Sequence, residues 1–436
     1  MDHDPGGSKD ESPVTREGAG QLRIGFDITV LYVAEAGVFY YTYNLIRALL
    51  GEDQENDYLL LDYYPIHGGW KQPTEPWEVS AANAEFVRRH GLRHRRLADW
   101  RPMRRGVLRS ASELVDRALF RPWSAAADAI MRRRLMLVLD GVDVLHSSDV
   151  LLWRQPGALN VITIYDLTAL LFPEYHTARN RELQERKLRF AQQEADVVIA
   201  ISEATKRDVV THLGIPAERV HVVYGGVDAA MRPVADSEVL ARALAPMGLD
   251  PGGYILNVGT IEPRKNLVRL VEAYSRVRKM MPAPVPKLVL AGAKGWHFEE
   301  VFERVDALGL QDQVLFTGRV GRHLLPLVYN GAVLFVYASL YEGFGLPVLE
   351  AMACGVPVVA SNISSLPEIV GEAGVLVDPT DTDELASSMA DLLGDRERRL
   401  ELRAAGLARA GWFSWERAAQ ETLGVYEGAL RTVLPP

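Results

Sequence analysis

The sequence contains little cysteine and no long apolar run. Cys354 is the single cysteine among 436 residues, so an internal disulfide is excluded, and no group of cysteines and histidines indicates a structural metal. No apolar stretch approaches the ~18 residues of a membrane-spanning helix. Residues 1–21 lack the apolar core of a signal peptide and predict a disordered tail, since they mix acids with Gly, Ser and Pro. We therefore expect a reducing, cytoplasmic setting.

Positive charge is scarce outside one segment. The formal net charge is −9, which argues against general binding of nucleic acids. Residues 88–134, however, hold fourteen arginines against four acids, a net charge of +10. Within them, apolar residues from 107 to 120 follow one helical face. Such a basic amphipathic helix can rest on an anionic membrane surface, or it can pack on its own domain with its arginines in water.

Short apolar runs alternate with helical patterns along most of the chain. In the first half these runs are 22–31, 142–148, 160–167, 195–203 and 219–228. After a segment that suits a linker, 231–253, the pattern restarts with 253–260, 287–293, 313–319, 332–339, 356–361 and 374–379. Strands that are apolar on both faces and alternate with helices form a parallel sheet covered on both sides. The pattern therefore predicts an α/β fold.

The restart predicts two tandem doubly wound, Rossmann-like domains that face an interdomain cleft. We place the first domain at 22–235 and the second at 236–413, and we expect a final helix within 414–436 to pack back on the first domain. Ligands of such sheets bind at the carboxyl ends of the strands. The dinucleotide fingerprint fails because Val348 stands where G-x-G-x-x-G needs glycine, and no P-loop occurs. NAD oxidoreductases and P-loop NTPases therefore lose support.

The stretch SLYEGFGLPVLEAMACGVPVVAS, residues 339–361, predicts a ligand-binding loop. Gly343 and Gly345 permit a tight turn after a strand, and Pro347 suits the first turn of a helix that Gly355 would close. The backbone amides of that turn would then lie at a helix N-terminus. Such amides receive a phosphate or sugar oxygen well.

Two carboxylates flank this loop, Glu342 before it and Glu350 about one turn inside the helix, so they would face different parts of one ligand. An anionic ligand also needs cations, and Arg264 and Lys265 in GTIEPRKN follow the first strand of the second domain. Arginine grips phosphate oxygens through a planar fork, and lysine supplies a compact charge. Alone, this pair more often marks a solvated loop; together with the acidic glycine loop it predicts a phosphate clamp.

The combination of EGFGLPVLE with its E-x7-E spacing, GTIEPRKN and FTGRV resembles the donor domain of family 4 retaining glycosyltransferases, which have the GT-B fold. DLTALLFPEYH and ADVVIAISEATKRDV resemble the bacterial mannosyltransferase-like branch. The resemblance implies transfer of a hexose from a nucleoside-diphosphate sugar to a glycan, glycolipid or small-molecule acceptor, without a metal or other cofactor. GDP-mannose is the first expectation for the donor, and UDP-glucose or another UDP-sugar is the second.

The resemblance also implies a role for each matching residue. Arg264 and Lys265 would neutralise the diphosphate and stabilise it as a leaving group. Glu342 would hold the sugar, and Glu350 would accept hydrogen bonds from the ribose hydroxyls. The other donor-binding positions would be Gly37, Gly259, Thr260, Arg319, Val320, Gly343, Phe344, Gly345 and Leu346, with the base at Arg319 and Val320.

Four residues of the first domain would face the sugar or the acceptor, namely Tyr165, Asp166, His146 and His176. Tyr165 stands where relatives commonly have a histidine that contacts the donor sugar, and its hydroxyl can still donate a hydrogen bond. Alternatively, Tyr165 packs its strand, Asp166 supports a loop, and each histidine is a satisfied polar residue. We expect no metal site, because the acidic DTD at 381–383 suits a helix cap.

Two other functions stay open. A GT-B epimerase would change the sugar of the nucleotide sugar without an acceptor, and a nucleotide-sugar-binding or scaffold protein would bind it without turnover. The expected partners are a nucleotide-sugar donor and a glycan or lipid-linked acceptor, with no nucleic acid. If residues 88–134 bind an anionic membrane surface, the protein is peripheral on the inner face of the cytoplasmic membrane.

Overall fold

The computed structural model describes residues 21–32, 37–62, 93–96, 135–149 and 151–433. The predicted tail at 1–21 therefore lies outside the described residues except for Gln21. The basic segment 88–134 likewise lies outside them, apart from a short strand, β3 (Arg93–Arg96). No helix in the described part of the chain is long and apolar enough to cross a membrane.

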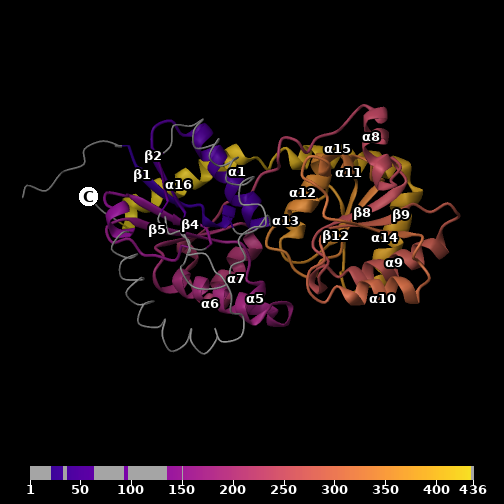
Figure 1. The fold of residues 1–436 in the computed structure, drawn as a ribbon, viewed down its shortest axis with the longest axis horizontal. Helices are drawn as coiled ribbons and strands as arrows, with labels where there is room; N and C mark the ends of the chain where they lie inside the picture. The colour runs from indigo at the N-terminus through magenta and orange to yellow at the C-terminus, as the bar shows by residue number, and fades with distance from the viewer. Residues whose placement is uncertain (1–20, 33–36, 63–92, 97–134, 150, 434–436) are drawn as a thin grey trace, which may run out of the picture.

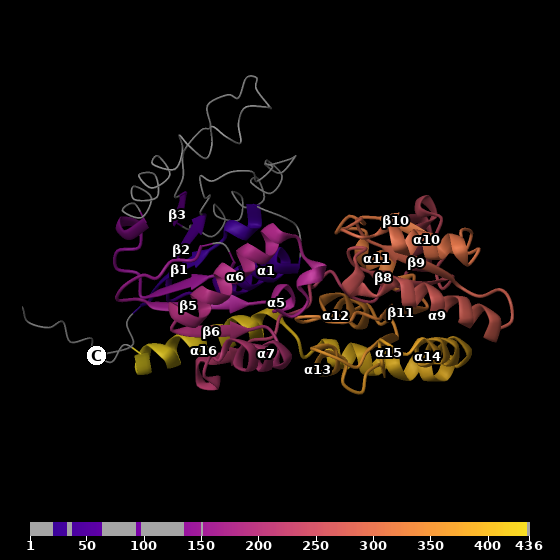
Figure 2. The same cartoon turned by 90° about the horizontal axis from the view of Figure 1, so that it is seen from below.

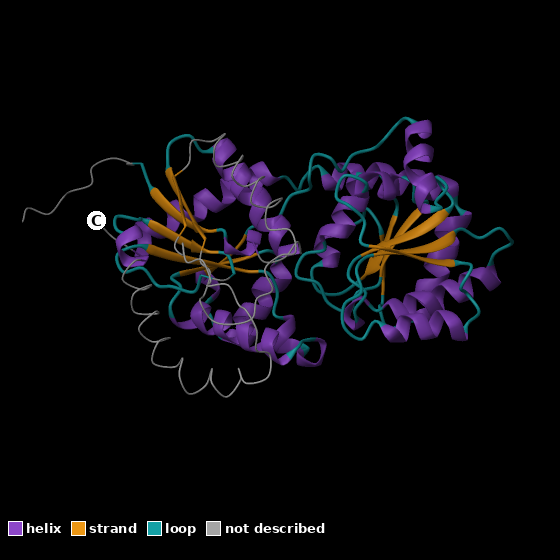
Figure 3. Cartoon of the chain, in the orientation of Figure 1, coloured by secondary structure: helices purple, strands orange, loops and turns teal. Residues whose placement is uncertain are grey.

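The described chain forms two α/β bodies side by side, each built on a parallel sheet with helices on its faces (Figures 1 and 3). The first sheet has seven strands in the order β3-β2-β1-β4-β5-β6-β7. Its other strands are β1 (Arg23–Asp27), β2 (Asp57–Asp62), β4 (Val144–Ser147), β5 (Leu159–Ile164), β6 (Val197–Ala200) and β7 (Val220–Val222). Five of the seven coincide with predicted runs, whereas β2 and β3 were not predicted.

The second sheet has six strands in the order β10-β9-β8-β11-β12-β13, all parallel and all at predicted positions. They are β8 (Tyr254–Val258), β9 (Lys287–Ala291), β10 (Val314–Gly318), β11 (Leu334–Tyr337), β12 (Val358–Ser361) and β13 (Val375–Val377). In this sheet the strand order reverses between β8 and β11, and in the first sheet between β1 and β4. Such switch points open a crevice at the carboxyl ends of the strands, where ligands bind.

Helices cover the sheets. They are α1 (Gly37–Glu52), α5 (Thr168–Leu171), α6 (Ala178–Gln193), α7 (Glu203–Leu213), α8 (Ser237–Leu244), α9 (Leu267–Met280), α10 (Glu299–Ala307), α11 (Leu325–Asn330), α12 (Leu346–Ala353), α13 (Leu366–Val370), α14 (Thr382–Gly394), α15 (Arg396–Ala410) and α16 (Trp415–Val433). Several of them, such as α6, α7 and α15, begin at a side-chain cap. Asp381 accepts from the amides of Asp383 and Glu384 and so caps α14, which confirms the capping interpretation of 381–383. Helix α8 occupies the predicted linker, where Asp236 caps it.

The last helix leaves the second body and lies along the first (Figure 2). Helix α16 packs on α1, and the Trp415 ring meets the Tyr41 ring edge-on at 5.4 Å between centroids. At Gly226 a Cβ would lie 2.3 Å from the backbone nitrogen of Trp415, so only glycine permits this approach. The chain therefore crosses between the two bodies twice, once before α8 and once before α16.

Candidate functional site

The glycine loop, defined as residues 341–345, joins β11 to α12 at the switch point of the second sheet. Gly345 has a φ of 106°, a left-handed conformation that favours glycine, and Pro347 follows in the first helical turn, as predicted. The hydroxyl of Ser365 donates to the carbonyls of Glu342 (2.9 Å) and Phe344 (2.8 Å). Ser365 directly precedes α13, so the start of this helix holds the glycine loop in place.

The cationic cluster, defined as Arg264 and Lys265 with Glu262 and Glu342, joins this loop to the turn after β8. Lys265 Nζ lies 2.5 Å from Glu342 Oε1, and Arg264 Nη1 lies 2.9 Å from Glu342 Oε2. Arg264 Nη2 also contacts Glu262 Oε1 at 2.6 Å. Because β8 and β11 are neighbours, their loops meet, and this brings together three residues predicted from two separate motifs.

Opposing effects set the pKa values in the cationic cluster. Burial alone would raise the pKa of Glu342, but Arg264 and Lys265 outweigh it and hold that pKa at about 2. Burial, together with the neighbouring Arg264, lowers the pKa of Lys265, although Glu342 opposes this shift. The cluster therefore consists of two cations and two carboxylates in a desolvated place, and it is electrostatically balanced.

Glu350 lies apart from the cationic cluster, in the helix α12 that follows the glycine loop. Its side chain is buried in α12, with Oε1 2.9 Å from Arg322 Nη1 and Oε2 2.9 Å from the Tyr329 hydroxyl. Burial raises the pKa of Glu350, against the lowering effects of Arg322 and Tyr329. The two acids of the E-x7-E spacing therefore face different partners, and sequence reasoning missed both partners of Glu350.

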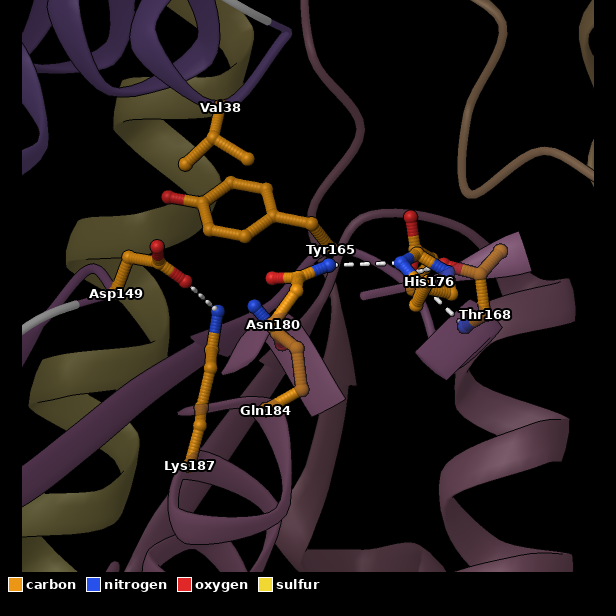
Figure 4. Close-up of a pocket in the computed structure, with 9 residues that line it drawn as sticks. Val38, Asp149, Tyr165, Thr168, His176, Asn180, Gln184 and Lys187 are labelled. Carbon is orange, nitrogen blue, oxygen red and sulfur yellow. Dashed lines mark hydrogen bonds and ion pairs between the residues drawn. The ribbon is translucent and has the colours of Figure 1, made fainter. Parts of the chain in front are cut away.

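On the other side of the boundary, the first domain forms a polar pocket (Figure 4). Lys187 Nζ lies 2.6 Å from Asp149 Oδ1 and 4.5 Å from the centre of the Tyr165 ring. The Tyr165 hydroxyl is 2.9 Å from Thr42 Oγ1, so it already has a partner within its own domain. The pocket is lined by Val38, Asp149, Tyr165, Asp166, Thr168, His176, Asn180, Gln184 and Lys187.

Besides Tyr165, two more of the predicted first-domain residues, Asp166 and His176, line this pocket in distinct roles. Asp166 accepts from the amide (2.9 Å) and the hydroxyl (2.6 Å) of Thr168, which confirms that it supports the loop. His176 Nδ1 lies 2.7 Å from Asn180 Nδ2, and its ring faces Trp296 of the second domain at 6.1 Å between centroids. Burial lowers the pKa of His176, which favours the neutral imidazole at the domain boundary.

His146 does not face the pocket, so the prediction that it faces sugar or acceptor is wrong. Its side chain is fully buried in β4, with Nδ1 2.5 Å from the Tyr426 hydroxyl and Nε2 2.7 Å from Thr163 Oγ1. Burial lowers the pKa of His146 to about 3. The residue is a satisfied core histidine that ties α16 to the first sheet.

The two domains touch directly at the glycine loop. At Gly343 a Cβ would lie 1.9 Å from the carbonyl oxygen of Tyr165, so any other residue would force the domains apart. The hydroxyl of Thr205 lies 3.4 Å from that carbonyl and 3.3 Å from the carbonyl of Gly343. Glu368 of α13 accepts from the first amides of α7, Glu203 N (2.8 Å) and Ala204 N (2.9 Å). These contacts hold the polar pocket beside the cationic cluster.

The remaining predicted donor positions lie at strand and helix ends. At Gly259, which directly follows β8, a Cβ would lie 3.4 Å from Lys265 Cε, and the neighbouring Thr260 is exposed. Arg319 and Val320 follow β10, the first exposed and the second half-buried. Gly37 begins α1, and among the described residues outside its own helical turn no atom lies within 4 Å of a Cβ placed there. Within the described ranges, no group of three or more His, Cys, Asp or Glu side chains could hold a metal ion.

Two family models match the chain, that of the glycosyl transferases group 1 over residues 249–409 and that of Glycosyltransferase Family 4 over residues 36–230. O-antigen chain mannosyltransferase B of Escherichia coli is 35% identical over 267 residues, which cover 61% of this chain and 70% of that protein. Serotype-specific mannosyltransferase WbdA of Escherichia coli is 32% identical over 262 residues, 59% of this chain and 32% of WbdA. The match thus spans about a third of WbdA's length.

Solved structures agree in fold. Anabaena HepE, in complex with UDP and glucose, has a TM-score of 0.67 at 18% identity, covering 94% of this chain and 100% of its own. WaaG, a glycosyltransferase involved in lipopolysaccharide biosynthesis, has a TM-score of 0.63 at 14% identity, covering 93% and 100%. Two Rossmann-like domains in tandem, together with these neighbours, define the GT-B fold. Within that fold class, the chain belongs to the family 4 glycosyltransferases.

Proposed function

We propose that the protein is a retaining, metal-independent hexosyltransferase that uses a nucleoside-diphosphate sugar, with GDP-mannose as the first choice of donor and a UDP-sugar as the second. The mannosyltransferase relatives support mannose. The observation that carries the proposal is the position of the cationic cluster, which lies at a strand switch point directly beside a polar pocket of the other domain.

The donor would bind to the second domain. Arg264 and Lys265 would meet the diphosphate, and they would neutralise the charge that it gains as the bond to the sugar breaks. Glu342 would keep the two cations in place and accept from sugar hydroxyls, and the amides of the glycine loop would donate to phosphate oxygens. Glu350 would accept from the ribose hydroxyls. Two side-chain cations at the diphosphate offer the neutralisation that a metal supplies in other transferases.

The acceptor would bind to the polar pocket of the first domain. Asp149, Asn180 and Gln184 offer hydrogen-bond acceptors and donors of the kind that sugar hydroxyls need. The acceptor hydroxyl would attack the anomeric carbon on the face from which the diphosphate departs, and its proton would pass to the departing phosphate oxygen. The sugar would keep its configuration, and no side chain would act as a covalent nucleophile. The acceptor would be a glycan, a lipid-linked glycan or a small molecule.

The location of the protein belongs to the same proposal. A lipid-linked acceptor would suit a peripheral protein at the inner face of the cytoplasmic membrane, with residues 88–134 on the anionic surface. A small-molecule acceptor would suit a protein that stays in the cytoplasm. Flotation with anionic vesicles, with and without 88–134, distinguishes these two settings.

A transfer assay followed by nuclear magnetic resonance tests the activity. The full chain is incubated with GDP-mannose or UDP-glucose, with acceptor glycans, and with or without EDTA. We expect acceptor-dependent release of nucleoside diphosphate, insensitivity to EDTA, and a product with the donor's anomeric configuration. A changed sugar without any acceptor would indicate an epimerase. Donor binding without turnover across all acceptors would indicate a binding or scaffold protein.

A further inference from the structure

One arginine of the second domain, Arg322, bridges both domains beside Glu350. Its Nη1 lies 2.9 Å from Glu350 Oε1, and its Nη2 lies 3.2 Å from Asp228 Oδ2. Its guanidinium carbon lies 4.3 Å from the centre of the Tyr40 ring. Glu350 belongs to α12, Asp228 to the segment between β7 and α8, and Tyr40 to the first turn of α1. A single side chain thus connects three elements from the two bodies.

The chemistry of arginine suits this position. Its planar fork can serve two carboxylates at once, and its flat face stacks on an aromatic ring. The contacts to Asp228 and Tyr40 cross the domain boundary, so they require the two domains to be close together. The contact to Glu350 lies within the second domain and does not depend on closure. Arg322 therefore contacts Glu350 through one terminal nitrogen, and through the other it contacts the first domain when the two domains are close together.

We propose that Arg322 is a positioning residue that couples nucleotide binding at Glu350 to the closure of the two domains. The inference rests on the proposed function, in which Glu350 accepts from the ribose hydroxyls. Among the described residues, each carboxylate oxygen of Glu350 has one hydrogen-bond partner, and its second lone pair can accept from a ribose hydroxyl while Arg322 stays in place. A nucleotide held there would share a carboxylate with the side chain that reaches Asp228.

Arg322 also keeps Glu350 in the form that a ribose needs. Among the described residues, the charged and titratable groups that interact with Glu350 include Arg322, Tyr329, Asp228, Tyr40 and Cys354. Arg322 is the cation of this set and lowers the pKa of Glu350, while burial and Asp228 both raise it. Without Arg322, the carboxyl would hold its proton at higher pH, and a protonated carboxyl accepts fewer hydrogen bonds. Arg322→Gln should therefore weaken nucleotide binding most at the acidic end of the pH range.

The contact between Arg322 and Asp228 can be removed without changing the contact between Arg322 and Glu350. Asp228→Asn leaves the pair of Arg322 and Glu350 intact and removes the charge that crosses the boundary. The second domain should still bind a nucleoside diphosphate nearly as the wild type does. Closure, however, should be less favourable, so the loss should fall on kcat. The two variants thus separate the two contacts of Arg322.

The experiment is a calorimetric titration of the full chain with GDP and with UDP from pH 5 to pH 8, together with a transfer assay. For Arg322→Gln we expect binding about 10-fold weaker at neutral pH and kcat lower by about 10-fold. The acidic limb of its affinity-versus-pH curve, where affinity falls with falling pH, should shift to higher pH. For Asp228→Asn we expect binding within about 2-fold of the wild type and kcat lower by about 10-fold. Arg322→Lys should restore the acidic limb, because it keeps the charge, but it should not restore kcat, because it lacks the fork.

The control is Arg278→Gln, which removes an exposed arginine of α9. It should change neither the affinity for nucleoside diphosphate nor kcat. In the double variant of Arg322→Gln and Asp228→Asn, the losses in kcat should not multiply, because both changes break one contact. The inference is overturned if the acidic limb of Arg322→Gln matches the wild type, or if the two losses multiply. If the wild-type chain binds no nucleoside diphosphate at all, the proposed function fails and the inference fails with it.

Discussion

The two sides of the domain boundary are built from different kinds of side chain. The second domain presents two cations and two carboxylates within one buried cluster, at 2.5–2.9 Å from one another. The polar pocket of the first domain presents the ion pair of Lys187 with Asp149 and the carboxylate of Asp166 among neutral groups such as Thr168, Asn180 and Gln184. Buried ions in fixed positions suit a charged phosphate, whereas neutral donors and acceptors suit sugar hydroxyls. This division supports donor binding on one side and acceptor binding on the other.

Lys265→Ala should give the largest effect, because it removes a cation from the charged side of the domain boundary. The change removes the ammonium at the proposed diphosphate position and leaves Glu342 paired with Arg264 alone. We expect kcat/KM for transfer to fall by about 10²–10³-fold, measured as the release of nucleoside diphosphate. Lys279→Ala, at an exposed lysine of α9, is the matched control and should keep full activity. An unchanged rate in Lys265→Ala would contradict the clamp.

Gly343→Ala should give the next largest effect, because it separates the two sides. The new Cβ would meet the Tyr165 carbonyl, which is backbone and cannot rotate away. We expect transfer to fall by about 100-fold, since a misplacement of about 1 Å between reactants can cost that much. Nucleoside diphosphate binding to the second domain should change little, which calorimetry would show.

A matched glycine controls for the substitution itself. Gly424→Ala lies in α16 with open space around its Cβ and should leave transfer unchanged. Wild-type transfer by Gly343→Ala would mean that the close contact of the two domains is not needed for activity.

Tyr165→Phe should have a small effect. It tests whether the Tyr165 hydroxyl, in the pocket of the first domain, takes part in the reaction. The Tyr165 hydroxyl has Thr42 as its partner, so its loss should cost about 1 kcal/mol of unfolding free energy. Transfer should fall by less than about 10-fold, because one lost hydrogen bond of that size accounts for no more. A much larger fall in kcat with normal stability would mean that the hydroxyl contacts the sugar in the reaction.

His146 should affect stability and not transfer, since its side chain is buried in the core and is not among the residues that line the pocket. Its pKa is about 3 in the folded protein and near 6.5 in the unfolded chain, so stability is complete above pH 6.5 and is lost as the pH falls. The free energy of unfolding should drop by about 1.4 kcal/mol per pH unit below that point. Urea titrations at pH 5.5 and 7 should show this slope reduced in His146→Gln and kept in the exposed variant His323→Gln. If stability fell with pH at the same slope in the wild type, His146→Gln and His323→Gln, the assigned role of His146 would be contradicted.

The motif-bearing parts of the site could be predicted from the sequence because each motif is local. The glycine loop, the Arg264–Lys265 turn and the start of α12 each depend on residues within a few positions of one another. Their meeting also depends on the pairing of β8 with β11, which the predicted doubly wound arrangement allows and the structure establishes. All strands of the second sheet follow from the alternation of strands and helices.

Other parts depend on contacts between distant segments, which a single sequence does not reveal. Arg322 is one of two arginines near the end of β10, and only the fold places it beside Glu350 and Asp228. Lys187 looks like a surface residue of an amphipathic helix, yet it is buried against Asp149. His146 was predicted to face sugar or acceptor, but its ring contacts Tyr426 of α16, because a helix from the far end of the chain returns to this sheet. Strand β2 was missed because its short apolar run lies between acids.

The most direct test of the central claim is a calorimetric titration with GDP, UDP, ADP and their sugar conjugates. It is carried out on the wild type and on Lys265→Ala, with and without EDTA. The account predicts that one nucleotide sugar binds selectively, that EDTA has no effect, and that Lys265→Ala weakens binding strongly. Failure of every nucleotide sugar to bind the wild type, or equal binding by Lys265→Ala, would contradict a donor site at the cationic cluster.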